Sequence, residues 1–236
     1  MDILAIAAHP DDVELCSSGT LIKHAKLGYK VGVIDLTQGE LGTRGNAQLR
    51  LKEAEAAGVV MGLSVRENLG LPDGFFDFGI ENKRRIVEKI RKYRPRIVLT
   101  NAIRDRHPDH GRASQLVSES CFLSGLVKFQ TVIDGKTQER WRPEAVYHFI
   151  QDRYIKPDVC VDITPFIDKK REAIMCFKSQ FFNPGSSEPD SPISGKDFLD
   201  FVFARTRDFG RSIAVDYAEG FTVERPVGAG DLFDLH

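Results

Sequence analysis

Short apolar runs alternate along the first half of the chain with longer segments in which apolar residues recur every three or four positions. The runs are rich in branched side chains and predict strands at residues 3–6, 31–36 and 96–100, with a further extended piece at 65–69. The longer segments have the spacing of amphipathic helices, which we predict at residues 13–27, 47–57 and 80–93. This strand–helix–strand order indicates a parallel α/β sheet, because a crossover must return the chain to the same end of the sheet.

The second half of the chain is less regular. A helix is expected from His110 to Gly125, and Asp134-Gly135 predicts the turn of a small hairpin. Further along, we predict strands at 145–150 and 159–163, helices at 166–179 and 196–213, and a closing segment at 219–223. Residues 183–195 contain several Pro and Gly breakers, and we interpret them as a loop that acts as a lid. The pattern therefore predicts one domain over residues 1–236, with a Rossmann-like, mostly parallel sheet flanked by helices and a few late strands.

Composition narrows the classes of function. The 236 residues are 42% apolar and 28% charged, which is ordinary for a soluble globular protein and argues against disordered, fibrous and membrane proteins. A formal net charge of -1 leaves no basic excess to follow a phosphate backbone, so we expect no nucleic-acid partner. The first residues lack both a basic segment and a long apolar run, so we expect no signal peptide or membrane anchor and a cytoplasmic protein. The four cysteines form no C-x-x-C pair, which favours free thiols.

Residues that can hold a metal follow two of the predicted strands. His9, Asp11 and Asp12 come directly after the first strand, which Pro10 prevents from continuing as a ladder. Adjacent carboxylates repel each other unless a cation or a donor lies between them, so a metal is the natural explanation. A second cluster follows the strand at 96–100 and consists of Arg104-Asp105-Arg106-His107-Pro108-Asp109-His110. Each cluster taken alone is also compatible with a capped turn.

The fold predicts that the two clusters meet. In an open parallel sheet the carboxyl ends of the strands face the same way, and ligands bind in the crevice outside them. The glycine-rich loop 37–45 also follows a strand, and we favour its Arg44 as a clamp for an acidic group over a solvated charge. Two imidazoles and a carboxylate suit zinc or ferrous iron with an open position for water. A further carboxylate suits the general base of a hydrolase, which a redox site does not need.

At these residues the chain resembles the LmbE/PIG-L family of metal-dependent N-deacetylases. The stretches that carry the resemblance are residues 8–14, 37–40, 42–44 and 107–110, followed by 178–180 and 217–221. The version found here most resembles the branch that removes acetate from N-acetylglucosaminyl malate in bacillithiol biosynthesis. The resemblance implies a small amino-sugar substrate and a homo-oligomer, a trimer or a hexamer.

The resemblance also implies a role for each site residue. It implies that His9, Asp12 and His110 hold zinc, with ferrous iron as the other candidate metal. It implies that Asp11 is the general base and that His107 stabilises the oxyanion or protonates the leaving amine.

Three further residues complete this expectation. Asp109 is expected to orient the imidazole of His107. Arg44 and Arg106 are expected to bind substrate, with Arg44 at its acidic group. Some relatives have a tyrosine two residues before the second motif that helps the oxyanion, whereas this chain has Asp105.

Other functions use the same residues. One is deacetylation of another N-acetylated sugar or glycoconjugate, since loops set substrate choice. Another is a ferrous oxygenase, and a third is a non-catalytic sugar- or nucleotide-binding module. The binding module lacks support, because no G-x-G-x-x-G follows the first strand.

Overall fold

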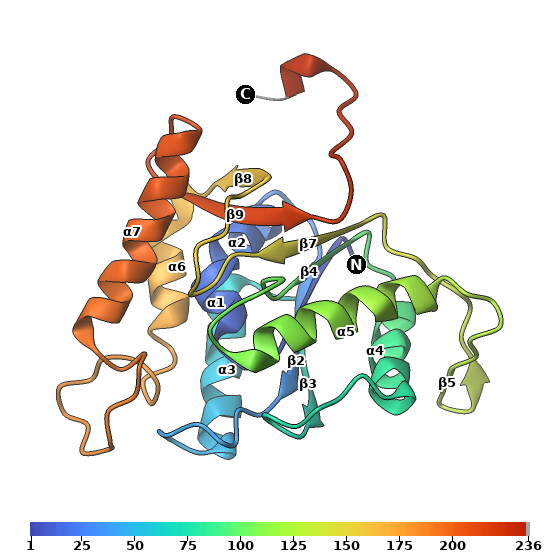
Figure 1. Ribbon diagram of the computed structural model, residues 1–236, viewed down its shortest axis with the longest axis horizontal. Helices are drawn as coiled ribbons and strands as arrows, with labels where there is room; N and C mark the ends of the chain where they lie inside the picture. Colours follow the sequence, from blue (N-terminus) through green and yellow to red (C-terminus); the bar gives the residue numbers. More distant parts are fainter. Residues whose placement is uncertain (235–236) are drawn as a thin grey trace.

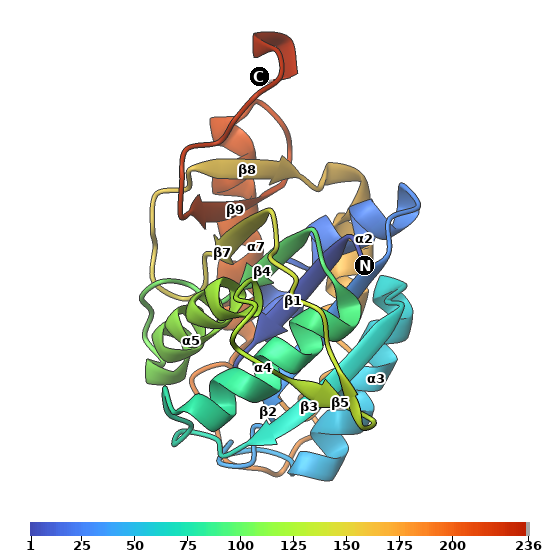
Figure 2. The ribbon, with the colours of Figure 1, turned by 90° about the vertical axis from the view of Figure 1, so that its right-hand side faces the viewer.

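A seven-stranded sheet organises the computed structural model, which describes residues 1–234 (Figure 1). Its spatial order is β3-β2-β1-β4-β7-β9-β8, which Figure 2 displays. The strands β3, β2, β1, β4 and β7 are parallel, whereas β9 runs antiparallel to both β7 and β8. The strand bounds are β1 Ile3–Ala7, β2 Val31–Thr37, β3 Val65–Leu71, β4 Ile97–Thr100, β7 Ala145–Phe149, β8 Val159–Asp162 and β9 Ala218–Val223. The predicted mostly parallel sheet with late strands is confirmed.

Helices cover both faces of this sheet (Figure 1). Their bounds are α1 Asp12–Cys16, α2 Ser18–Lys26, α3 Ala47–Met61, α4 Ile80–Tyr93, α5 Pro108–Ser124, α6 Ile167–Ile174 and α7 Lys196–Ser212, with short 3₁₀ turns η1 Thr164–Phe166 and η2 Leu232–Asp234. None of the helices in residues 1–234 is long and apolar enough to cross a membrane.

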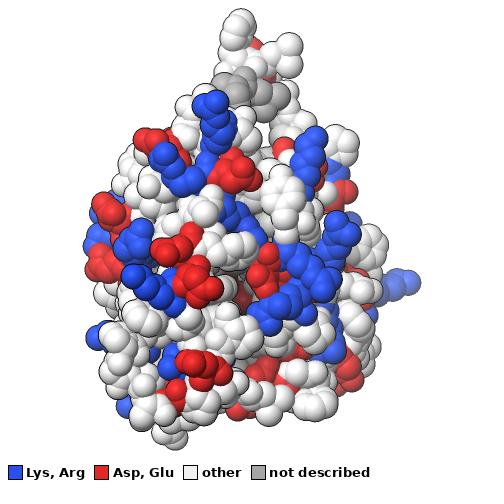
Figure 3. Space-filling view, turned by 60° about the vertical axis from the view of Figure 1, so that its left-hand side comes forward, with Lys and Arg blue, Asp and Glu red and all other residues white. Residues whose placement is uncertain are grey.

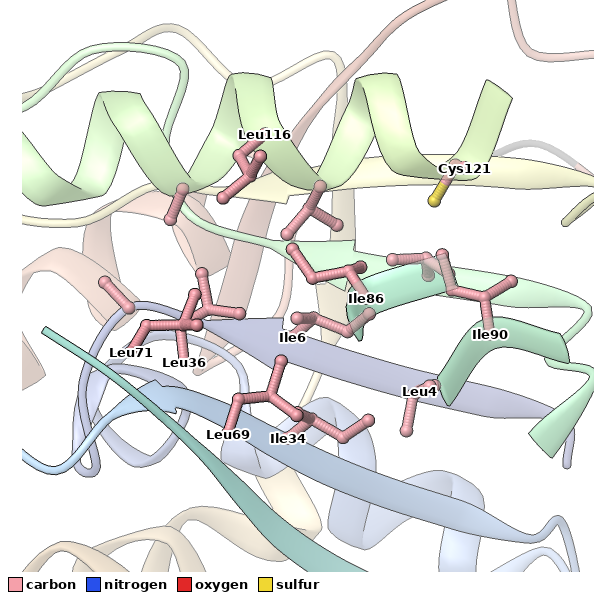
Figure 4. Packing of buried hydrophobic residues seen from close by; sticks show 14 of the residues in the cluster. Leu4, Ile6, Ile34, Leu36, Leu69, Leu71, Ile86, Ile90, Leu116 and Cys121 are labelled. Atoms are coloured by element: carbon pink, nitrogen blue, oxygen red, sulfur yellow. The ribbon is translucent and has the colours of Figure 1, made fainter. Parts of the chain in front are cut away.

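Alternate side chains of β1 enter two different cores. Leu4 and Ile6 pack against α4 and α5 on one face, where Figure 4 shows them. Ile3 and Ala5 point to the other face and pack against α1, α2, α3 and α6. Because both faces are buried, the strand is apolar throughout instead of alternating with polar residues. This burial fixes β1 in the centre of the sheet and places its carboxyl end beside that of β4.

The small hairpin is present where the turn residues predict it. Strands β5 Val132–Ile133 and β6 Lys136–Thr137 pair antiparallel. The turn residues Asp134 and Gly135 have φ of 51° and 73°. Two positive φ values in succession are the geometry that Asp-Gly favours in a two-residue hairpin loop.

The helix predicted at 13–27 is wrong in one respect, because the chain forms two helices separated at Ser17. The reason is tertiary. The carboxylate of Glu219 in β9 accepts hydrogen bonds from the backbone N–H of Gly19 at 3.0 Å and of Thr20 at 2.7 Å. These are unpaired amides of a helix N-terminus, and a buried acceptor that satisfies them lets a second helix begin there.

The helix predicted at 166–179 is also shorter, since α6 ends at Ile174. The chain then turns so that Phe177 and Phe181 enter a core with α3 and α7. Ser179 is held there by Glu53, which accepts from its backbone N–H at 2.8 Å and its hydroxyl at 2.7 Å. Burial of two aromatic rings outweighs continuation of the helix.

Candidate metal centre

The structure brings the two predicted clusters together at the carboxyl ends of β1 and β4. These strands are parallel neighbours, with Ile6 opposite Thr100. His9 follows β1, and His107 is the N-cap of α5. The ring centroid of His9 lies 4.7 Å from that of His107 and 5.5 Å from that of His110.

The geometry supplies donors for a metal ion. Nitrogen atoms of His9, His107 and His110 lie within 4.8 Å of one another. The carboxylate of Asp12 approaches two of these rings, with Oδ2 3.5 Å from His9 Nδ1 and Oδ1 3.1 Å from His110 Nε2. Asp12 therefore lies between the rings of His9 and His110. Buried imidazoles and a carboxylate fit a divalent transition metal.

The chain holds Asp12 in place through two amides that the sequence did not single out. Asn101 Nδ2 donates to Asp12 Oδ2 at 2.9 Å, and Gln151 Nε2 donates to Oδ1 at 3.0 Å. Burial favours a raised pKa for Asp12, but His110 and His9 outweigh it and hold the pKa well below the usual value. Both amides directly follow strands, β4 and β7, so the rule that locates His9 would also have found them.

Asp11 is buried beside this set and is paired with a cation. Its Oδ2 accepts from Nη2 of Arg50 in α3 at 2.7 Å. Burial raises the pKa of Asp11 to about 6, while the Arg50 guanidinium opposes the rise. Asp11 also has a φ of 113°, which non-glycine residues rarely adopt and which clusters at functional sites. The sequence does not predict this role for Arg50, because nothing local distinguishes a buried arginine from an exposed one in a helix with many charged residues.

Two carboxylates orient the His9 ring from the side opposite Asp12. Nε2 of His9 lies 3.0 Å from Asp73 Oδ1 and 3.5 Å from Asp109 Oδ2. Burial favours a lowered pKa for His9, but hydrogen bonds with Asp109, Asp12 and Asp73 raise it well above the usual value. Once Nδ1 has lost its proton, the ring still donates Nε2–H to Asp73 and has its lone pair on Nδ1, toward Asp12. Asp73 follows β3 and was not predicted.

Asp73→Asn is therefore expected to weaken divalent-metal binding about tenfold to a hundredfold, because a carboxylate that fixes a ligating imidazole raises its basicity. The measurement is the dissociation constant for Zn²⁺ from competition with a chelating dye. Asp134→Asn, at the exposed hairpin turn, is the control and should leave the constant unchanged. Equal constants for the Asp73 variant and the wild type would show that Asp73 does not support the ligand.

Within residues 1–234, Asp109 uses its carboxylate for contacts with groups other than the His107 ring. Its carboxylate contacts His9 and forms an ion pair with Arg112, and it also accepts from the backbone N–H of Gly74 at 2.8 Å. His107 is held instead by the main chain, because its Nδ1 accepts the backbone N–H of Asp109 at 3.2 Å. His107 is the N-cap of α5, and the backbone N–H of Asp109 in the first turn of that helix orients its ring. The expectation had been that the Asp109 carboxylate would do so.

Asp105 supports His110. Its Oδ2 lies 2.5 Å from His110 Nδ1, and its Oδ1 accepts from the backbone N–H of Arg153 at 2.7 Å. Burial favours a lowered pKa for His110, but Asp12 and Asp105 raise it to about 9. Asp105 therefore fixes the orientation of a candidate ligand.

Arg44 and Arg106 line the same cavity as the histidines, a space of about 320 Å³. Arg44 is 5% exposed, and its Nη1 donates to the carbonyl of Phe181 at 3.5 Å. Its Nε has no partner within residues 1–234. Arg106 is exposed and paired with Asp152. Figure 3 shows one face of the molecule, on which a contiguous group of Lys and Arg lies right of the centre and Asp and Glu are interspersed around it.

The loop 183–195 borders the cavity with residues 191–193. The carboxylate of Glu188 accepts the backbone N–H of Gly45 at 2.8 Å, which joins this loop to the one that carries Arg44. Gln180 Nε2 also donates to the carbonyl of Arg44 at 2.9 Å. The two loops therefore define one wall of the site together.

Known sequences are similar to this chain over much of its length. The PIG-L family model, described as GlcNAc-PI de-N-acetylase, matches residues 4–121. Diacetylchitobiose deacetylase of Thermococcus kodakarensis is 30% identical, over 76% of this chain and 70% of the relative. 4-Oxalmesaconate hydratase of Pseudomonas putida is 26% identical, over 75% and 73%. A probable N-acetyl-alpha-D-glucosaminyl L-malate deacetylase 2 of Bacillus anthracis is 24% identical, over 76% and 81%.

Solved structures share the fold along almost the whole chain. A conserved protein of Thermus thermophilus superposes with a TM-score of 0.86 at 34% identity and covers 97% of both chains. N,N'-diacetylchitobiose deacetylase of Pyrococcus horikoshii superposes with a TM-score of 0.78 at 25% identity, over 94% of this chain and 83% of that one. With a family match that spans both histidine motifs, the chain belongs to the PIG-L family and is an enzyme of the N-deacetylase type.

Proposed function

We propose that the protein is a metal-dependent hydrolase that removes the acetyl group from an N-acetylglucosaminide, and that N-acetylglucosaminyl malate is its substrate. The observation that carries this proposal is the buried Asp11 carboxylate beside a cluster of three imidazoles in a PIG-L chain. A base next to metal donors is the arrangement that hydrolysis of an amide requires.

His9, Asp12 and His110 are the residues that we assign to the metal, with zinc as the proposed ion and ferrous iron as the alternative. When bound, such an ion acidifies a water molecule and polarises the amide carbonyl. His9 and His110 are already oriented by Asp73 and Asp105, and Asp12 is held by Asn101 and Gln151. Little reorganisation therefore accompanies binding.

Asp11 is assigned as the general base. It takes the proton of the water that attacks the acetamide carbon, and the new C–O bond gives a tetrahedral oxyanion. The C–N bond then breaks as the amine nitrogen takes up a proton, giving acetate and a free amine. Arg50 keeps the carboxylate in one orientation through its 2.7 Å contact. A pKa near 6 leaves Asp11 mostly ionised at neutral pH and suited to accept a proton.

His107 is assigned to the oxyanion and the leaving amine. Its Nδ1 accepts a backbone N–H, so the neutral ring carries its proton on Nε2. Burial lowers the pKa of His107, and the neighbouring His9 and His110 lower it further. The ring is therefore a neutral Nε2–H donor, which suits stabilisation of a developing negative charge.

Arg44 is assigned to the malate carboxylate. A guanidinium that is 5% exposed, lines the cavity and has an Nε without a partner in residues 1–234 is suited to donate hydrogen bonds to a carboxylate. The Bacillus anthracis relative, named for a glucosaminyl malate substrate, supports this choice. The relatives named as diacetylchitobiose deacetylases support the alternative of another N-acetylated sugar.

The test is acetate release from N-acetylglucosaminyl malate, measured with chelator and after addition of zinc or, without oxygen, ferrous iron. We expect release that the chelator abolishes and the metal restores. Arg44→Met should raise KM about tenfold or more for the malate compound, since loss of a hydrogen bond to a charged group costs about 1.5–3 kcal/mol, and should change KM for N-acetylglucosamine much less. Release from diacetylchitobiose alone would transfer the proposal to that substrate. Absence of acetate from every N-acetyl sugar would contradict it, and would be the result for a hydratase.

A further inference from the structure

The cavity extends beyond the candidate metal centre along one face of α7. Phe198, Val202 and Phe209 of that helix line it and recur at helical spacing. Leu15 packs with the first two, and Ile150 packs with Phe209. We call this part of the cavity the apolar arm, and its wall is completed by Cys16, next to Leu15 in α1.

The polar side chains that border the apolar arm already have partners, although Arg205 uses only its Nη2 in a hydrogen bond within residues 1–234. Both oxygens of Glu219 are occupied, by backbone N–H groups of α2 and by Lys170 Nζ at 2.8 Å. The hydroxyl of Thr206 donates to the carbonyl of Phe203 at 2.8 Å within the helix. Arg205 donates to the carbonyl of Asp152 and lies 4.5 Å over the ring of Phe201. A ligand in the arm therefore finds apolar contact and few hydrogen-bond partners.

This limits which part of an N-acyl amino sugar fits the arm. Sugar hydroxyls buried there without partners would each lose their hydrogen bonds to water. In the arm an acidic aglycone would have to compete with the contacts that Arg205 makes with Asp152 and the Phe201 ring, whereas Arg44 borders the cavity on the loop 37–45. The acyl chain is the apolar part of the molecule, and it extends from the carbon that is attacked beside His9, Asp12 and His110.

We propose that the apolar arm binds the acyl chain, so that the enzyme hydrolyses N-acylglucosamines with straight chains of four to six carbons in preference to the N-acetyl compound. This inference rests on the proposed deacylase function and extends it from acetyl to longer acyl groups. The cavity of about 320 Å³ lies at the lower end of the range of pockets that enclose drug-sized ligands. An acetyl group would place only one methyl in the arm.

The experiment measures glucosamine release from N-acetyl-, N-butyryl- and N-hexanoylglucosamine by the zinc-loaded protein. Each methylene buried in the arm should raise kcat/KM up to about fourfold. Val202→Trp, which fills the arm, should lower the ratio of hexanoyl to acetyl kcat/KM at least tenfold. Val227→Trp places the same side chain at an exposed position and should leave that ratio unchanged. Thermal unfolding monitored by circular dichroism verifies that each variant is folded.

A second measurement needs no variant. Butyrate and hexanoate should inhibit the wild-type N-acetyl reaction progressively more strongly than acetate, because each carries its alkyl chain into the arm. Two results would overturn the acyl assignment and leave the proposed function intact. One is hydrolysis of N-acetylglucosamine with a tenfold lower rate for N-hexanoylglucosamine, and the other is equal inhibition by acetate, butyrate and hexanoate. No hydrolysis of any of the three compounds would overturn the acyl assignment, and acetate release from N-acetylglucosaminyl malate would then decide the proposed function separately.

Discussion

Asp11→Asn is expected to lower kcat for N-acetyl hydrolysis by a factor of about a hundred to ten thousand while the purified protein still binds its metal. The size of the loss is that of a general base removed from its proton-transfer step. Metal binding should persist because the assigned donors are His9, Asp12 and His110. The measurements are initial rates of acetate release and the metal content after gel filtration.

The choice of asparagine matters for this experiment. Asp11 has a φ of 113°, a conformation that asparagine tolerates better than alanine, so the amide variant preserves the local backbone. Asparagine also retains an oxygen that can accept from Arg50. Asp134→Asn makes the same substitution at an exposed turn, and as the control it should leave kcat unchanged. A variant that keeps wild-type activity with full metal content would remove Asp11 from the role of base.

The fold was largely predictable because both faces of the sheet are buried. Burial makes β1 and β2 apolar at nearly every position, and it gives α4 an apolar stripe, so periodicity identifies them. The errors lie where a distant residue decides the structure. The division between α1 and α2 depends on Glu219, which lies about 200 positions away in the sequence and satisfies the first amides of α2.

The part of the site that could be predicted from the sequence consists of residues that follow strands, because the carboxyl ends of parallel strands lie at one edge of the sheet. His9, Arg44 and His107 follow strands, and the structure places all three around one cavity. The supporting residues Asp73 and Gln151 also follow strands, but neither belongs to a cluster of metal-binding side chains in the sequence.

Arg50 is a different case, because it lies in the first turns of a helix. Its burial depends on how α3 packs against the loop that carries Gly39, whose carbonyl it also reaches at 3.1 Å. No local pattern reveals such a contact. The same holds for Glu14, which belongs to the first motif yet faces away from the metal donors and pairs with Arg66 of β3.

Arg66 joins two buried carboxylates, and its loss is expected to destabilise the protein strongly. Its guanidinium pairs with Glu14, and its Nε contacts Asp35 Oδ2 at 3.0 Å. The side chains of Arg66, Glu14 and Asp35 are 8%, 0% and 2% exposed. Arg66→Met keeps much of the volume but leaves both carboxylates without their cation. Removing one partner of a buried ion pair costs about 3–5 kcal/mol, so we expect a fall of that size in the free energy of unfolding.

The matched control is Arg96→Met, which removes an arginine from an ion pair with Glu144 in which both side chains are more than half exposed. That change should cost less than about 1 kcal/mol, because water already solvates both charges. Urea unfolding followed by circular dichroism measures both values.

The cost of Arg66→Met should also shrink at acidic pH. Burial already raises the pKa of Asp35 to about 6 against the pull of Arg66, and without that cation the carboxyl protonates more readily still. A group whose folded pKa lies above its unfolded value gains stability as the pH falls through the folded pKa. The free energies of unfolding of Arg66→Met and Arg96→Met should therefore differ most above pH 7 and converge near pH 5. If Arg66→Met lowered the free energy of unfolding equally at every pH, the buried network would contribute through packing and not through charge.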